Sequence, residues 1–296
     1  MHRQFEAANH PKYRVALVTD SIADLPTTFI DQHQIHQYPL NLHMEDSIYY
    51  DKVTIKSERF YQLMDELEVY PTSSQPNAKS LDNFFSFLTT YYDEILVITV
   101  SKEMSGTYQA FVDAAKKYPE KKIHVLNLIQ NSGEEGLLVM KAQSQIEQAL
   151  PLDEIVEKME HVVPRSKIYV SVQTLKYMVR SGRVSKVTGI IGKIANLKPV
   201  ISIDADGKGI ISDKGLSIRS ADKKIYAHIK ETHDQHGIDS YAIVHAKGGK
   251  RVDEYIDKYT KLIGKKPDYV MDISTIVAMN AGLGSIAIAY IRGEKS

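Results

Sequence analysis

Short, continuous apolar runs alternate with longer amphipathic stretches in the first half of the chain. The runs at 14–19 (RVALVT), 94–100 (EILVITV) and 123–129 (IHVLNLI) are each followed by polar residues and then by a helix-like stretch. Runs of this length are typical of parallel strands that are buried on both faces. Because strands alternate with helices, the pattern predicts an α/β layer architecture for this half.

Serine residues precede three of the expected helices in this half. Ser80, Ser105 and Ser132 each stand directly before a segment with helical composition. A serine side-chain oxygen can accept a hydrogen bond from a backbone N–H that the first helical turn leaves unpaired. We therefore expect each serine to be the N-cap of the helix that follows it.

The pattern changes after Pro164, where strands and helices follow one another in a less regular order. Segments 199–204 (PVISID) and 209–217 (GIISDKGLS) flank a turn and are expected to form a hairpin. The other elements expected here are strands at 167–172, 240–246, 268–273 and 285–291 and helices near 219–236 and 252–263. The sequence therefore predicts an N-terminal parallel-sheet α/β domain over residues 1–164 and a C-terminal α+β domain over residues 165–296.

Composition places the chain among ordinary globular proteins and limits its partners. Of 296 residues, 43% are hydrophobic and 25% charged, and Lys plus Arg and Asp plus Glu both number 37. No positive excess therefore favours nucleic acid or an anionic membrane. No apolar run approaches the roughly 20 residues of a membrane helix, and the first residues lack a signal-peptide core. We expect a cytoplasmic protein that inserts into no membrane and binds no nucleic acid.

The stretch SKEMSGTYQA at 101–110 places hydroxyls and a glycine where a strand passes into a helix. In open α/β sheets, ligands lie beyond the carboxyl ends of the strands, and a helix N-terminus offers free N–H groups to an anion. Ser105, Gly106 and Thr107 could thus form a small anion site, with Gly106 allowing close backbone approach. A plain N-cap is the alternative, and this stretch taken alone favours it.

Three further polar clusters stand between apolar segments. PTSSQPN at 71–77 is too polar for a strand and predicts an ordered loop facing a ligand, or an ordinary turn. TDSIADLP at 19–26 places Asp24 ahead of the next helix, which Asp24 is expected to cap. NAGLGS at 280–285 precedes a strand and lacks the phosphate-loop lysine, so neither nucleotide-binding motif is present.

Motifs of several enzyme classes are missing from the sequence. There is no GxSxG, no HExxH and no cysteine, and no histidine base for Ser105 is evident. His233 and His236 have a spacing that could bind a metal, but they stand in a charged helix end that is expected to be solvated. We therefore expect no catalytic residue, no metal site and no cofactor.

Together, these clusters resemble the DegV family of bacterial fatty-acid-binding proteins, over roughly residues 14–292. The stretch at 101–110 is close to the family's SGTYQSA, while TDSIADLP at 19–26 and SSQP at 73–76 match its DSTADLP and TSQP elements. LKYMVRSGRVS at 175–185 resembles the family's L-x-y-L-x-x-G-G-R-I-S.

The resemblance implies a fold of two α/β domains with a long-chain fatty acid buried between them. In that family, hydroxyl side chains hold the carboxylate and an apolar tunnel holds the tail. Family members with an assigned role present the carboxylate to a separate kinase, which forms an acyl phosphate for lipid synthesis. The resemblance thus implies a noncatalytic carrier whose partners are a fatty acid and a kinase.

Individual residues match the positions that carry these roles in the family. Ser105 matches the serine at the carboxylate, and one of Thr72, Ser73 and Ser74 matches the hydroxyl of the second loop, with Ser73 the first choice. Arg183 matches the arginine implicated in engaging the kinase. A surface arginine at a helix connection is the alternative for Arg183.

Two segments depart from the family pattern. The segment 274–284 has Asn280 where the family commonly has histidine and Leu283 where it has proline. An asparagine amide can donate a hydrogen bond to a carboxylate, but it cannot titrate. Asn127 and Leu128 stand where the family often has an Asp-Ser pair, so that loop is matched only weakly.

The expected acyl tunnel needs apolar residues from both domains. In the helix-like stretch 184–200, Ile190, Ile191 and Ile194 recur at helical spacing. They are candidates for a tunnel wall, and ordinary core packing accounts for them equally well.

Two alternatives to a fatty-acid carrier remain open at this point. One is an enzyme on the same scaffold, transferring an acyl or phosphoryl group at Ser105. The other is a carrier for a different amphipathic anion, which is suggested by Asn280 and Leu283.

Overall fold

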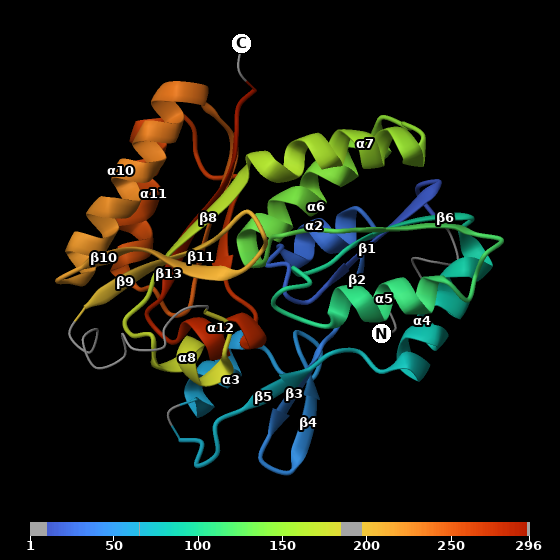
Figure 1. The fold of residues 1–296 in the computed structure, drawn as a ribbon, viewed down its shortest axis with the longest axis horizontal. Helices are drawn as coiled ribbons and strands as arrows, with labels where there is room; N and C mark the ends of the chain where they lie inside the picture. The colour runs from blue at the N-terminus through green and yellow to red at the C-terminus, as the bar shows by residue number, and fades with distance from the viewer. Residues whose placement is uncertain (1–10, 65, 185–196, 295–296) are drawn as a thin grey trace.

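The structure is a computed structural model that describes residues 11–64, 66–184 and 197–294. Figure 1 shows two halves, each built around a sheet with helices packed beside it. This mixed α/β architecture, with a parallel sheet and a second sheet, confirms the predicted fold class. Among the described residues, no helix has both the length and the apolar composition needed to cross a membrane.

The first sheet has four parallel strands in the order β2-β1-β6-β7. They are β1 (Val15–Asp20), β2 (His36–Tyr38), β6 (Glu94–Ile98) and β7 (Lys122–Leu126). The three apolar runs thus form β1, β6 and β7, and every residue of β1 is buried. The helices described in this half are α2 (Thr27–Gln32), α3 (Ser57–Leu63), α4 (Ala78–Tyr91), α5 (Thr107–Ala115), α6 (Ser132–Glu147) and α7 (Leu152–Val162), followed by the short 3-10 helix Val163–Arg165.

A small antiparallel sheet projects from this half, in the order β4-β3-β5. Its strands are β3 (Asn41–Met44), β4 (Ser47–Tyr50) and β5 (Thr72–Ser74). The prediction that segment 71–77 is too polar for a strand is therefore wrong. Pairing with β3 supplies the backbone hydrogen bonds, and an edge position leaves the hydroxyls of β5 partly exposed.

The second sheet has six strands in the order β10-β9-β8-β13-β11-β12. They are β8 (Ser166–Ser171), β9 (Lys198–Ile203), β10 (Gly209–Gly215), β11 (Ile238–His245), β12 (Tyr269–Asp272) and β13 (Ile286–Arg292). The antiparallel pairing of β9 with β10 confirms the predicted hairpin. The helices described here are α8 (Lys176–Ser181), α10 (Ile218–His236), α11 (Lys250–Ile263) and α12 (Thr275–Ala281).

The two faces of the second sheet have different partners. On β11, Tyr241 and Ile243 belong to the core beneath α10 and α11, whereas Ala242 and Val244 face the core shared with the first half. The helix α6 lies between the halves and packs on β1, β8, β11 and β13. Gly133 of α6 lets Val244 approach its backbone closely, since a Cβ there would lie 3.0 Å from that side chain. This close packing holds the two sheets against a common helix.

The three predicted serine N-caps are wrong in position. The N-cap of α4 is Asn77, whose side chain accepts from the Ser80 N–H at 2.8 Å. Gly106 precedes α5 and Asn131 precedes α6, so Ser132 is already helical. Asparagine is as good a cap as serine, and Asn77 stands three residues before Ser80, so α4 begins earlier than the serine suggested.

The predicted cap at Asp24 is also wrong. The residue that precedes α2 is Pro26. The Asp24 carboxylate instead accepts hydrogen bonds from Ser132 Oγ at 2.6 Å and from the Ser274 backbone N–H at 2.7 Å. Asp24 therefore connects segments far apart in the sequence.

Candidate functional site

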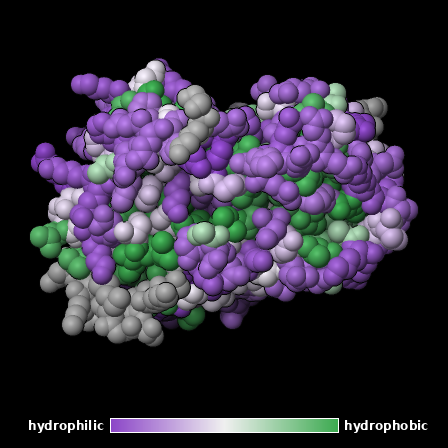
Figure 2. Space-filling model, turned by 45° about the horizontal axis from the view of Figure 1, so that its top comes forward, coloured by the Kyte–Doolittle hydropathy of each residue, from purple (hydrophilic) through white to green (hydrophobic). Residues whose placement is uncertain are grey.

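A cavity of about 240 Å³ lies between the two halves of the chain. The second sheet contributes Ile168, Val170, Ile201, Ile203, Val244 and Ala287 to its wall. The first half contributes Ile22, Leu40, Val100 and Met104, and α12 contributes Ile276, Val277 and Ala281. Figure 2 shows hydrophobic atoms exposed across the middle of one face of the molecule. Mainly apolar walls favour a ligand with a hydrocarbon portion.

Ser105 lines this cavity from the segment that leads into α5. Its Oγ lies 2.8 Å from Thr107 Oγ1 and accepts the Thr107 backbone N–H at 3.2 Å. Thr107 itself is fully buried and is not part of the wall. The threonine thus fixes the serine hydroxyl in place, while the serine faces the ligand space.

Gly106 lines the cavity beside Ser105 and allows a second segment to approach. A Cβ at Gly106 would lie 1.6 Å from Gln75 Oε1. The side chain of Gln75, which follows β5, therefore occupies the space that any larger residue at 106 would need. The glycine was expected to make room for a ligand, and it makes room for the neighbouring loop.

The three consecutive hydroxyls of β5 have different surroundings. Ser73 and Ser74 line the cavity, and Thr72 is exposed and does not. Ser74 Oγ lies 2.9 Å from His43 Nε2 and accepts from Asn41 Nδ2 at 3.3 Å. Among the described residues, no hydrogen-bond partner of the Ser73 hydroxyl is found, so Ser73 keeps its full capacity for a ligand.

Asn280 reaches the cavity from the last turn of α12. Its Nδ2 donates to the Ile276 carbonyl at 2.7 Å, which fixes the amide orientation. Its Oδ1 is buried and has no hydrogen-bond partner among the residues that the structure describes. Asn280 therefore offers the cavity an acceptor as well as its second N–H donor.

Arg183 is an exposed residue and also part of the cavity wall. Its guanidinium donates to the Ser181 carbonyl. It is the one charged side chain among the described residues of the wall.

Ile190, Ile191 and Ile194 lie outside the described residues, so their predicted place in the tunnel stays a prediction.

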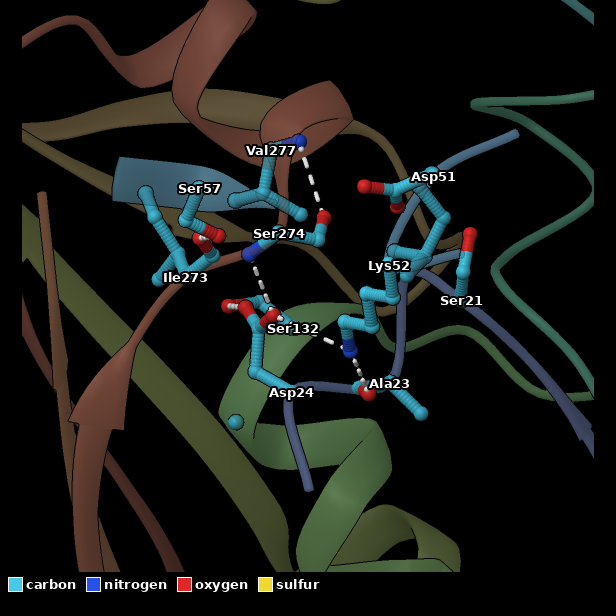
Figure 3. Close-up of polar contacts among 12 residues, drawn as sticks. Ser21, Ala23, Asp24, Asp51, Lys52, Ser57, Ser132, Ile273, Ser274 and Val277 are labelled. Carbon is cyan, nitrogen blue, oxygen red and sulfur yellow. Dashed lines mark hydrogen bonds and ion pairs between the residues drawn. The ribbon is translucent and has the colours of Figure 1, made fainter. Parts of the chain in front are cut away.

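The first residue of α12 and the segment before it are attached to the first half by several hydrogen bonds, some of which are drawn in Figure 3. The Thr275 N–H and hydroxyl donate to Asp51 Oδ1 at 3.1 and 2.6 Å. Ser57 Oγ and Tyr61 OH donate to the Ile273 carbonyl at 2.6 and 2.9 Å. Together with Asp24 at Ser274, these contacts form an anchor that positions the cavity residues of α12.

Buried carboxylates lie around this anchor and outside the cavity wall. Burial raises the pKa of Asp20 and of Asp24 to about 6 each, although the nearby Lys52 ammonium lowers both. Burial likewise raises the pKa of Asp51 and of Glu135. Lys52 Nζ lies 3.6 Å from Asp24 Oδ1 (Figure 3). In the part of the chain that the structure describes, no three acidic, histidine or cysteine side chains form a group that could hold a metal ion.

Asp20, the last residue of β1, also holds wall segments in place through backbone hydrogen bonds. Its two carboxylate oxygens accept from the Ile22 N–H at 2.7 Å and the Val100 N–H at 2.9 Å. Ile22 and Val100 both line the cavity. The carboxylate thus fixes two wall segments without reaching the ligand space itself.

Sequence reasoning missed several wall residues. Gln75 and Asn131 line the cavity; Gln75 belongs to the SSQP element and could have been found from it. Ser202 and Ser285 also line the cavity. No sequence signal points to Ser202, because it belongs to β9 and reaches the site only through the fold. Ser285 ends the NAGLGS cluster at 280–285 and could have been found from it.

Comparisons with known proteins agree with this architecture. A family model described as "Uncharacterised protein, DegV family" matches residues 14–293. A DegV domain-containing protein of Caldanaerobacter subterraneus is 31% identical over 219 residues, covering 74% of this chain and 78% of that protein.

Two solved structures share the fold. A fatty acid binding DegV family protein from Streptococcus agalactiae has a TM-score of 0.86 at 22% identity, covering 96% of this chain and 100% of that chain. A stearic acid-binding protein from Eubacterium ventriosum has a TM-score of 0.83 at 23% identity, with 95% and 98% covered.

Proposed function

The chain belongs to the DegV family, and from this premise we propose that it binds a long-chain fatty acid without catalysing a reaction on it. The observation that carries the proposal is a cavity with mainly apolar walls whose lining includes Ser73 and Ser105. Proteins of this fold include a fatty acid binding protein and a stearic acid-binding protein. The walls suit an acyl chain, and the hydroxyls suit its head group.

The carboxylate is proposed to accept hydrogen bonds from Ser105 and Ser73. A hydrogen bond to a charged acceptor contributes about 1.5 to 3 kcal/mol. Ser74 and the backbone N–H of Gly106 lie next to these hydroxyls and can complete the site, and the N-terminus of α5 adds positive potential. Thr107 acts through Ser105, whose hydroxyl it holds. The second N–H of Asn280 remains available from the opposite half.

A noncatalytic role agrees with the surroundings of Ser105. Within the described residues, its hydroxyl pairs with Thr107, whereas a nucleophilic serine needs an adjacent base such as histidine. Neutral donors of this kind orient a carboxylate and leave its chemistry to another protein.

We further propose that a separate kinase receives the bound acid and phosphorylates its carboxylate. Arg183 supports this role because it is exposed and also part of the cavity wall. Lys176 and Arg180 are exposed on the neighbouring α8, and the Arg180 guanidinium lies 4.7 Å from the centre of the Tyr70 ring. These cations offer an acidic partner surface a docking point beside the cavity.

Extraction of the purified protein under denaturing conditions, followed by mass spectrometry, tests the binding proposal. Wild type and Ser144→Ala, in which an exposed serine of α6 is removed, should release about one fatty acid per chain. Ser105→Ala should hold roughly tenfold less after washing, as expected for the loss of one charge-assisted bond. A wild type that neither carries a fatty acid nor takes up added stearate contradicts the proposal.

The kinase proposal is tested with Arg183→Ala. We expect stearate affinity to stay within about twofold, because neutral groups hold the carboxylate. Acyl phosphate formation by a fatty acid kinase from the same cells should fall at least tenfold through weaker docking. Unchanged phosphorylation at subsaturating protein would remove Arg183 from the docking surface.

A further inference from the structure

Two buried polar atoms of the cavity residues have no hydrogen-bond partner within the described part of the chain. They are Asn280 Oδ1 and Ser285 Oγ, and both residues line the cavity. Ser285 is 1% exposed. A buried polar atom without a partner is costly and rare in native proteins, so these two atoms point to a ligand group that the apolar walls do not explain.

The position of Ser285 interrupts an apolar surface. It stands directly before β13 and two residues from Ala287, so both side chains lie on the same face of the sheet. Ala287 pairs with Val170 on one side and with Val244 on the other, and all three line the cavity. The Ser285 carbonyl accepts the Ala246 N–H at 3.0 Å. The fixed backbone therefore places the Ser285 hydroxyl at the end of the row of apolar wall residues formed by Val170, Ala287 and Val244.

The orientation of Asn280 determines what chemistry it can recognise. Because Nδ2 already donates to Ile276, the atom left without a partner is the carbonyl oxygen. That oxygen only accepts hydrogen bonds, and neither a carboxylate nor a methylene group can donate one. A ligand hydroxyl can donate to Asn280 Oδ1, and its oxygen can accept from the Ser285 hydroxyl.

On the basis of the fatty-acid-binding function proposed above, we propose that the preferred ligand is a hydroxylated fatty acid. The alcohol on its acyl chain is recognised by Asn280 and Ser285, and its carboxylate is held by Ser73 and Ser105. Asn280 and Ser285 are then specificity-determining residues, distinct in task from the hydroxyls at the carboxylate.

The cavity provides a matched control for Ser285. Ser202 is also a wall residue and is 1% exposed, but its hydroxyl donates to the Ile168 carbonyl at 2.7 Å. Ser202→Ala removes a hydroxyl of the same kind from the same cavity without removing an unpartnered one. It should leave ligand preference unchanged.

The test compares equilibrium binding of stearate with binding of its positional isomers that carry one hydroxyl along the chain. Wild type and Ser202→Ala should bind at least one hydroxylated isomer about tenfold more tightly than stearate, as expected for a newly satisfied buried hydrogen bond. Ser285→Ala should lose most of this preference while keeping its stearate affinity, and Asn280→Leu should lose most of the preference as well. If Asn280→Leu does not fold, Ser285→Ala decides the matter alone.

The outcomes separate the two proposals. Stearate binding with no preference for any hydroxylated isomer overturns this inference and leaves fatty-acid binding intact. A preference that survives in both Ser285→Ala and Asn280→Leu also overturns it. Binding of neither stearate nor any isomer overturns the underlying function.

Discussion

Two groups of polar residues meet at α12, and they differ in charge and in task. The cavity wall presents uncharged groups such as Ser73, Ser105 and Asn280. The anchor behind it contains the buried carboxylates of Asp24 and Asp51, which accept hydrogen bonds from the backbone of residues 274 and 275. A carboxylate in the wall would repel a fatty-acid head group, whereas behind the wall it stabilises the fold. The anchor should therefore govern stability, and the wall should govern binding.

The largest expected effect is that of Asp51→Ala on stability. Its removal leaves the N–H and the hydroxyl of Thr275 without their acceptor in a fully buried place. At about 1 to 3 kcal/mol for each orphaned donor, the free energy of unfolding should fall by about 4 kcal/mol. Urea denaturation measures this, with the exposed Asp46→Ala as control. A loss below about 1 kcal/mol in Asp51→Ala would mean that the anchor does not hold α12.

The second prediction concerns the pH dependence of stability. Burial raises the folded-state pKa of Asp24 to about 6, above its ordinary value of 3.8. The folded state then binds the proton more tightly than the unfolded state, so this contribution to stability is present below about pH 4 and is lost as the pH rises through 6. The loss amounts to about 2 to 3 kcal/mol.

Asp24→Asn isolates this contribution, because an amide of the same shape cannot titrate. The difference in unfolding free energy between wild type and Asp24→Asn should shift against the wild type between pH 4 and pH 7. Asp46→Asn, at an exposed position, should show no such trend. A wild-type difference that is flat over this range would place the Asp24 pKa near its unfolded value.

The smallest effect on stability is expected for Ser105→Ala. The change removes one acceptor for the Thr107 N–H at a partly buried site, so the free energy of unfolding should change by about 1 kcal/mol or less. Its stearate affinity should nevertheless fall about tenfold. A stability loss as large as that of Asp51→Ala, with affinity retained, would reverse the contrast between wall and anchor.

Local patterns in the sequence determine much of the fold. β1 and β6 could be predicted because a continuous apolar run has few alternatives to a buried strand. The hairpin of β9 and β10 could be predicted because its turn is short and contains glycine. The strand β5 could not, because its hydroxyls are tolerated only through pairing with β3, a contact across some thirty residues.

The residues of the candidate site also fall into those that the sequence predicts and those that it does not. Ser105 and Ser73 could be proposed from motifs, and both line the same cavity. The anchor could not be predicted, since Asp24 and Ser274 are 250 positions apart and an aspartate before a helix ordinarily predicts a cap. Thr72 shows a further limit: of three consecutive hydroxyls, Ser73 and Ser74 line the cavity and Thr72 does not, and composition does not reveal which of them faces the ligand space. The domain boundary near residue 164 and the tunnel role of Ile190, Ile191 and Ile194 stay predictions.

A crystal structure of the protein loaded with stearate would locate the carboxylate and the acyl chain directly. We predict a carboxylate oxygen within about 3 Å of Ser105 Oγ, with the acyl chain against the row formed by Val170, Ala287 and Val244. A carboxylate at the opposite end of the cavity, or a stearate bound elsewhere, would contradict it.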